Sequence, residues 1–257
     1  MEGSLRSLGF IRSQLNAGRY ASWCEFRATG PSGLHSETPY ILPTSMSNSA
    51  LALELAEQFC KVADRIHGLY LDATMGMGTL AQHHAAWDIA RLNALEKAGE
   101  LTDPSQLNPT IAYAGKARGE EGELHSTSMH ELISRNFPNG TNWRFLANMC
   151  VVAIYQYWEY EYRGRIADAL QCEKNKVVHP VLGELRQLRR SIIHNGGRAV
   201  HEVGRSEVLP AFAKGVEIAL TPEHIHDIAA HVQDAAREAS RGASPEPAAR
   251  VCCARAR

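Results

Sequence analysis

The chain lacks three features that would quickly assign it to a well-marked class: paired cysteines, long apolar runs and a large excess of one charge. Its six cysteines form no CxxC pair and no framework spacing, which argues against a disulfide scaffold and is typical of thiols in a reducing cytosol. No apolar run reaches the roughly 18 residues of a membrane-spanning helix, and the N-terminus shows no secretory signal pattern. We therefore expect a cytoplasmic protein that does not contact a membrane.

Net charge and the spacing of reactive residues exclude further classes of function. With 27 basic and 28 acidic residues, the net charge is -1, which argues against a globally basic nucleic-acid binder but leaves room for a local basic patch. No pair of carboxylates and no His/Cys cluster has the spacing of metal ligands, and no elbow motif supports a Ser-His-Asp triad. We expect neither a metal ion nor an organic cofactor.

The 257 residues are enough for one large domain or two small ones. A clear helix start follows Met46, so the protein begins either at Met1 or at Met46. Composition and periodicity predict four regions. These are a poorly ordered lead-in (1–48), an N-terminal helical region (49–140), a second helical domain (141–240) and a disordered, Pro-, Ala- and Arg-rich tail (241–257).

The N-terminal helical region opens with apolar residues at three- and four-residue spacing over 50–69, which predicts an amphipathic helix. The sequence MGMG (75–78) interrupts that pattern. We interpret it as a helix–helix turn rather than a phosphate-binding loop, because no strand precedes it. A second helix is expected over 79–98, and a long polar loop over 101–125.

Capping and aromatic patterns predict the next two helices. Ser128 and Glu131 form a capping box ahead of a short helix, and a long helix follows over 142–171. Its aromatic run YQYWEYEY (155–162) suits a surface that lies half against the core and half against a partner. The alternative is a set of plain core aromatics on a long helix.

Proline positions mark the last two helices. Pro180 opens a helix that ends at HNGG, and 214–220 resembles a short extended piece. Thr221 and Pro222 make a helix start, a cap followed by proline at the first helical position, for a last helix that reaches about Ala239. The predicted fold class is all-α, a helical bundle with at most a short β element before the last helix.

Arg189 lies on what should be the apolar face of the helix that Pro180 opens. At about 100° per residue, its direction falls between those of Leu185 and Leu182. A guanidinium on such a face is costly unless a carboxylate, a phosphate or a cluster of carbonyls meets it. One explanation is therefore an anion-binding role. The alternative is a structural ion pair with one of three carboxylates of the aromatic helix: Glu159, Glu161 or Asp168.

His194 ends the same helix, in front of two glycines that allow a left-handed turn. On its own, a histidine at this place is more often a C-terminal cap than a catalyst. Together with Arg189 and Asn195, it makes a set of groups that phosphodiester chemistry uses, because the imidazole moves protons and the guanidinium stabilises charge on phosphorus. Arg186 and Arg190 extend a polar stripe beside it.

At these residues the chain resembles the HEPN superfamily (higher eukaryotes and prokaryotes nucleotide-binding). That superfamily is marked by an arginine, four to six residues and a histidine near the end of a helix in an α-helical bundle. Arg189, the four residues RSII and His194 match that spacing, and LRRSIIHNGG resembles the small prokaryotic members. The resemblance covers roughly 141–239 and makes the second helical domain HEPN-like. One residue departs from the pattern, since Arg190 stands where active members usually carry Asn, Asp or His.

The resemblance implies a metal-independent endoribonuclease of the toxin or antiphage-defence type. RNA would be its substrate, two subunits would combine their motifs in one cleft, and an antitoxin or defence-system protein would be a partner. Arg189 and His194 would be the catalytic residues, with Arg190 and Asn195 in support. Two alternatives stay open: a non-catalytic HEPN-like binding or scaffolding module, which Arg190 favours, and an unrelated helical protein in which Arg189 forms a structural ion pair.

Overall fold

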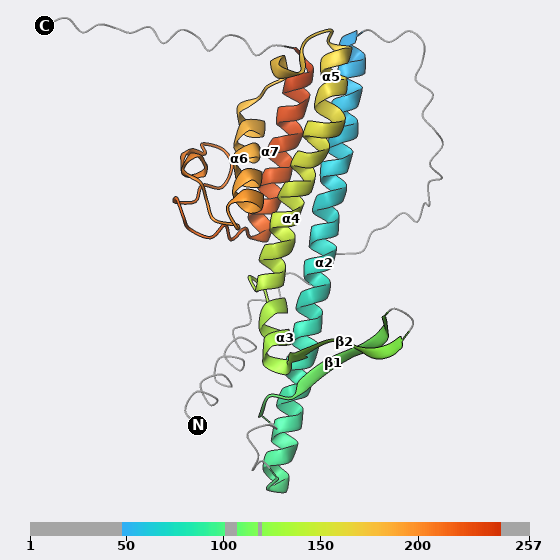
Figure 1. The fold of residues 1–257 in the computed structure, drawn as a ribbon, viewed down its shortest axis with the longest axis vertical. Coiled ribbons are helices and arrows are strands. Elements are labelled where there is room, and N and C mark those ends of the chain that lie inside the picture. The colour runs from blue at the N-terminus through green and yellow to red at the C-terminus, as the bar shows by residue number, and fades with distance from the viewer. Residues whose placement is uncertain (1–47, 101–106, 118–119, 243–257) are drawn as a thin grey trace, which may run out of the picture. The chain divides into compact units, whose positions relative to one another are not determined.

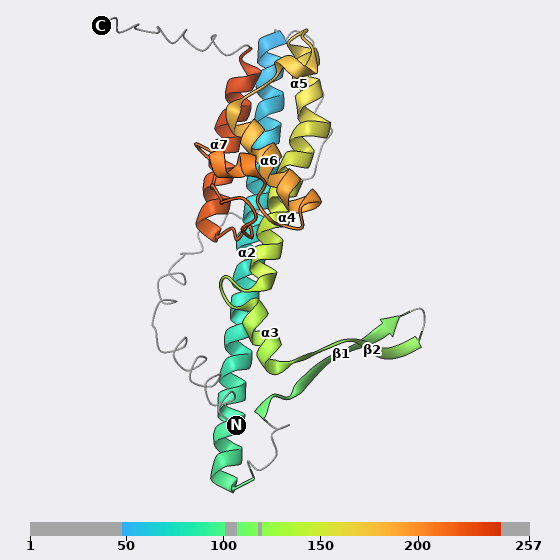
Figure 2. The same cartoon turned by 60° about the vertical axis from the view of Figure 1, so that its left-hand side comes forward.

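The computed structural model describes residues 48–100, 107–117 and 120–242, and they are mostly helical, as the sequence predicts. The lead-in before residue 48, the two candidate start sites and the tail beyond residue 242 lie outside the described residues. Figures 1 and 2 show the elements. They are α2 (Asn48–Ala98), β1 (Thr110–Ala117), β2 (Glu120–Ser128), α3 (Met129–Asn136), α4 (Thr141–Tyr157), the π-helical segment η2 (Trp158–Tyr162), α5 (Arg163–Ala169), η3 (Lys174–Lys176), α6 (Pro180–His194), η4 (His201–Arg205) and α7 (Pro222–Ser240).

The described residues divide into two compact units, and the larger one joins residues 48–82 to residues 132–242. Within it, the first part of α2 and the helices α4, α6 and α7 contribute their apolar faces to one core (Figure 1). The ring of Phe59 is 5.4 Å from that of Trp158 and 5.6 Å from that of Tyr162, measured between centroids. Burial of such large aromatic surfaces is the main stabilising term of a helical core.

The aromatic run of the long helix is divided between core and surface. Trp158 and Tyr162 are 2% and 8% exposed, whereas Tyr157 and Tyr160 are 47% and 73% exposed. The run coincides with the end of α4 and with η2, where the amide of Arg163 bonds to the carbonyl of Trp158, five residues back. Such wide turns inside α-helices are rare and are frequent at functional sites. The predicted long helix is therefore real but contains a π turn.

The predicted starts of the last two helices are confirmed. α6 begins at Pro180, and the preceding His179 accepts a hydrogen bond from the amide of Val181 through its side chain. α7 begins at Pro222, with Thr221 accepting from the amide of His224 while His224 Nδ1 accepts from the amide of Thr221. Both starts are specified by local chemistry, a capping side chain followed by proline.

The predicted turn at MGMG is wrong, because α2 continues through residues 75–78 as one 51-residue helix. A glycine inside a helix costs only about 1 kcal/mol relative to alanine, which is too little to end a helix whose other residues favour it. The hydroxyls of Thr74 and Thr79 donate to the carbonyls of Tyr70 and Met75, one turn back, and so bond within the helix.

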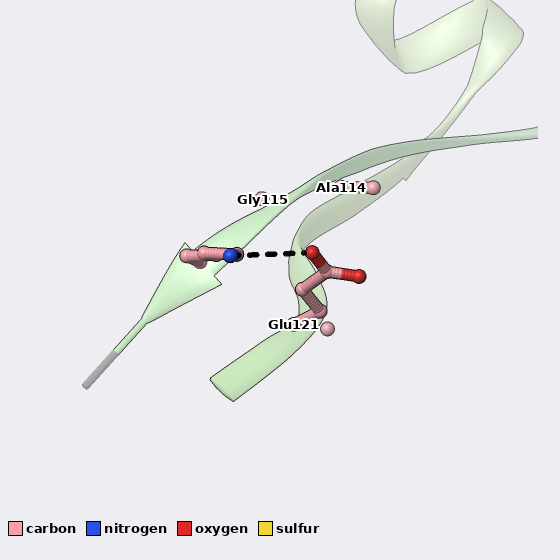
Figure 3. A pocket seen from close by; sticks show the side chains of 5 residues that line it. Ala114, Gly115 and Glu121 are labelled. Atoms are coloured by element: carbon pink, nitrogen blue, oxygen red, sulfur yellow. Dashed lines mark ion pairs between the residues drawn. The ribbon is translucent and has the colours of Figure 1, made fainter. Parts of the chain in front are cut away.

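The smaller unit includes residues 83–131, and its β1–β2 hairpin replaces most of the predicted polar loop. The two antiparallel strands are the only sheet in the described residues, so the short β element lies far earlier in the chain than predicted. Lys116 pairs with Glu121 across the hairpin at 3.5 Å, beside a hollow that Ala114 and Gly115 also line (Figure 3). The register shifts after Tyr113.

The extended piece expected at 214–220 is present only as a single antiparallel bridge, between Arg198 and Glu217. The amide of Ile218 donates to the carbonyl of Gly197, and the amide of Ala199 donates to that of Val216, both at 2.8 Å. This bridge closes the loop that follows α6 and so fixes the chain just beyond His194.

Candidate functional site at the end of α6

α6 buries one face in the core of the larger unit and leaves the other to solvent. Arg189 is half-buried at the margin of the buried face, and Ile193, near the end of the helix, is 44% exposed. Ser191 is fully buried, and its side chain donates to the carbonyl of Gln187 and accepts from the amide of Val200. The buried face consists of Val181, Leu182, Leu185, Leu188 and Ser191.

The structure brings Arg189 and His194 into contact, with Nη1 of the arginine 3.4 Å from Nε2 of the histidine. A guanidinium has only donors, so a hydrogen bond between the two groups requires His194 Nε2 as the acceptor, in the tautomer that carries its proton on Nδ1. His194 is exposed. The pair therefore presents an acceptor nitrogen and a cation side by side at an accessible position.

The structural ion pair considered for Arg189 does not form. Glu159 instead pairs with Arg163 at 2.9 Å and Lys174 at 3.0 Å, and Glu161 pairs with Arg165 at 2.8 Å. No ion pair involving Arg189 occurs in the part of the chain that the structure describes, and its Nε atom is buried without an acceptor there. The charge of Arg189 is thus not neutralised by any carboxylate of the residues that the structure describes.

The turn after His194 uses the two glycines as predicted. Gly196 and Gly197 have φ angles of 59° and 74°, in the left-handed region that glycine adopts without strain. The amide of Gly197 bonds back to the carbonyl of Ser191, which ends α6 in the manner of a Schellman motif. Asn195 Nδ2 donates to the carbonyl of Arg198 at 2.7 Å, so Asn195 holds this turn rather than facing Arg189.

Two further arginines of α6 give the site a basic surrounding. Arg190 approaches Glu202 at 3.8 Å, with both side chains at least half exposed, and Arg186 is also exposed. A contact of that length between exposed groups contributes little and leaves the positive charge accessible. The predicted stripe of Arg186, Arg190 and His194 is therefore on the surface of α6.

Tyr155 was predicted from the sequence as part of the aromatic run, but not as a neighbour of Arg189. Its ring, 8% exposed, lies under the guanidinium of Arg189, with 6.0 Å from Cζ to the ring centroid. Its hydroxyl donates to Oε2 of Glu159 at 3.4 Å. Nothing local in the sequence marks the contact, because it joins two helices 34 positions apart and depends on how α4 and α6 pack.

Other site chemistries find little support in the described residues. No three His, Cys, Asp or Glu side chains there converge on a point where a metal ion could bind, and no helix among them is long and apolar enough to cross a membrane. The chain matches no protein-family model, no curated protein and no solved structure. The arrangement at α6 therefore has to be interpreted from its own geometry.

Proposed function

We propose that the protein is a metal-independent endoribonuclease of the HEPN type, with Arg189 and His194 as its catalytic residues. The observation that supports it is the contact between an accessible imidazole and an arginine that no carboxylate of the described chain neutralises. A phosphodiester supplies the missing negative charge, and its 2′-hydroxyl supplies a proton for His194 to accept.

The proposed reaction is an internal transfer at phosphorus. When the phosphate draws Arg189 away from His194, the Nε2 lone pair becomes free and removes the proton of the ribose 2′-OH. The 2′-oxygen then attacks the adjacent phosphorus, while Arg189 stabilises the charge on the non-bridging oxygens. The bond to the 5′-oxygen breaks, and that oxygen takes a proton from a second histidine. The products are a 2′,3′-cyclic phosphate and a 5′-hydroxyl end, and DNA is spared because it lacks the 2′-OH.

The second histidine is that of another copy of the chain, since each protomer has one at this motif. Apolar side chains are exposed on α4 and η2, beside α6 in the fold, and they offer a surface for this contact. We expect Phe145→Glu to convert a dimer into a monomer in light scattering at micromolar concentration. Leu69→Glu, on α2, is the matched control, since the two native side chains are 68% and 62% exposed. The exposed set is Phe145, Met149, Tyr157 and Tyr160.

The deciding experiment is RNA cleavage in excess EDTA. Wild-type protein should cut RNA and leave DNA of the same sequence intact. His194→Ala should lower the rate by roughly 10²–10⁴-fold, which is the usual contribution of general acid–base catalysis. His231→Ala, at another exposed histidine, is the control and should cleave like wild type. Intact RNA with the wild-type protein, or equal rates for the two variants, would refute the proposal.

A second candidate is an RNA-binding module with the same fold and no catalysis. Arg190 favours it, because a second exposed arginine follows Arg189 where active HEPN proteins usually carry a polar residue. Binding of RNA that weakens with salt, without any cleavage, is the outcome this candidate predicts. An antitoxin, nucleotidyltransferase or defence gene beside this one would favour the ribonuclease.

A further inference from the structure

We infer that Tyr155 is the positioning residue of the site and holds the Arg189 guanidinium against its ring face, beside His194. This inference rests on the proposed function only for its effect on cleavage, since the contact itself can be tested without any activity. The ring centroid lies 6.0 Å from Arg189 Cζ, within the range of a cation–π interaction.

A partly buried arginine usually pairs with a carboxylate, whereas Arg189 contacts the ring of Tyr155. Arg189 Nε is buried without an acceptor, and the other contacts of the guanidinium within the described chain are the tyrosine ring and His194 Nε2. An aromatic face attracts a cation through its quadrupole but does not neutralise it. Tyr155 can therefore fix the direction of Arg189 while leaving its full charge for a ligand, which a glutamate at the same place could not do.

Tyr155 is itself fixed by a charged cluster on the following turn. Glu159 accepts from the Tyr155 hydroxyl at 3.4 Å and binds Arg163 and Lys174 at 2.9 and 3.0 Å. Burial acts to raise the pKa of Glu159, but the hydrogen bonds from Lys174 and Arg163 outweigh it, so this pKa is lowered and the group is a carboxylate. Burial, followed by the nearby Glu159, raises the pKa of Tyr155, so the phenol keeps its proton and donates it.

The same cluster connects the π turn to the segment that leads into α6. Arg163 Nε donates to the carbonyl of Val177 at 2.9 Å, and Lys174 Nζ donates to the carbonyl of Glu159 at 2.6 Å. α6 begins three residues after Val177, at Pro180. These bonds tie the segment ahead of α6 to the charged cluster that fixes the Tyr155 hydroxyl. A phenol that donates to an anion has a more electron-rich face for the guanidinium.

The test compares Tyr155→Phe with Tyr155→Leu by two independent measurements. In NMR, ring currents should shift the Arg189 side-chain protons upfield in wild type and in Tyr155→Phe, and the shift should vanish in Tyr155→Leu. The signals are assigned by their loss in Arg189→Lys. In kinetics, Tyr155→Phe should stay within about threefold of wild type, whereas Tyr155→Leu should lower kcat by roughly 3- to 30-fold with a smaller change in KM.

Tyr162→Leu is the matched control, since Tyr162 is also 8% exposed and lies on the same run of helix but contacts Arg165 instead. It should lose comparable stability while keeping the Arg189 shift and kcat. Unchanged Arg189 signals in Tyr155→Leu, or equal losses of kcat in the two leucine variants, would overturn the inference. If the wild type cleaves no RNA, the proposed function fails while the NMR comparison still decides on Tyr155.

Discussion

Two arginines of the larger unit have different partners: one is paired with carboxylates, and the other is not. Arg237, on α7, donates to both oxygens of Glu57 at 2.7 and 3.3 Å and to Asp234 at 3.2 Å. Arg189, on α6, has a tyrosine ring and an imidazole as neighbours and, in the described part of the chain, no carboxylate. The first arginine is saturated with counterions, and the second is not.

The difference separates a structural arginine from one that can bind a ligand. The hydrogen bond from Arg237 is the main cause that lowers the pKa of Glu57, and the same bond raises the pKa of Arg237. Each charge is thus stabilised by the other within the fold. A cation whose neighbours are an aromatic ring and an imidazole has no carboxylate partner of this kind, so an external phosphate meets little competition for it.

The largest effect we expect comes from replacing each of the two arginines with alanine and comparing the two variants in one experiment. Arg189→Ala should slow RNA cleavage by about 10²–10³-fold, the usual loss when a charge-stabilising donor is removed from a transition state. Its melting temperature should change by only a few degrees, because no ion pair is lost. Arg237→Ala should cleave RNA like wild type. Rate assays and thermal melts on the same samples check both, and equal rates would break the comparison.

A smaller effect is expected for Arg190, whose charge is accessible but not at the reacting phosphate. Arg190→Ala should weaken RNA binding several-fold at low salt and lower the slope of log affinity against log salt by about one. Cleavage of saturating RNA should persist. Fluorescence anisotropy at several salt concentrations measures the slope, and an unchanged slope would show that Arg190 makes no phosphate contact.

Next in size is the stability that the structural arginine provides. Arg237→Ala should lower the free energy of unfolding by about 1 kcal/mol, the upper end for a partly exposed ion pair with good geometry. Glu57→Gln should cost a similar amount, and a double-mutant cycle should show that the two losses are not additive. Urea denaturation gives these values. Full additivity would mean that the pair contributes no energy of its own.

The smallest effect is the pH dependence of that pair. The folded pKa of Glu57 lies below its ordinary value of 4.5. Its contribution is therefore fully present above the ordinary value and is lost as pH falls through the lower, folded one. The difference in unfolding free energy between wild type and Glu57→Gln should be constant from pH 7 to 5 and shrink below pH 4.5. A difference that stays constant down to pH 3 would contradict this assignment.

The parts of the fold that were predictable from sequence are those with local chemical causes. Pro180 and Thr221–Pro222 marked the starts of α6 and α7 because capping and proline act within one turn. The predicted break at 75–78 was wrong because two glycines destabilise a helix too little to end it when the residues on both sides favour the helix. The hairpin was missed because its strands are largely exposed on both faces and so carry no apolar alternation.

The neighbours of Arg189 were only partly predictable from the sequence. Spacing alone put Arg189 and His194 near each other, and the structure shows them 3.4 Å apart. Arg189 and Arg237 look alike as sequence, and what distinguishes them is packing between distant segments. Glu57 is 180 positions from Arg237, and Tyr155 is 34 from Arg189. No local pattern carries that information.

The π turn at Trp158–Tyr162 also determines how far α5 is rotated relative to α4 about the axis of the long helix. A turn closed by a bond to the fifth residue back holds about one residue more than an α-turn. Deleting one residue there would restore regular α-helix and rotate α5 by about 100° relative to α4. Tyr162 would then leave the ring of Phe59, while Tyr155, which precedes the turn, would keep its place beside Arg189. The extra residue of the π turn thus lets Tyr162 point into the aromatic core while Tyr155, on the same long helix, points at Arg189.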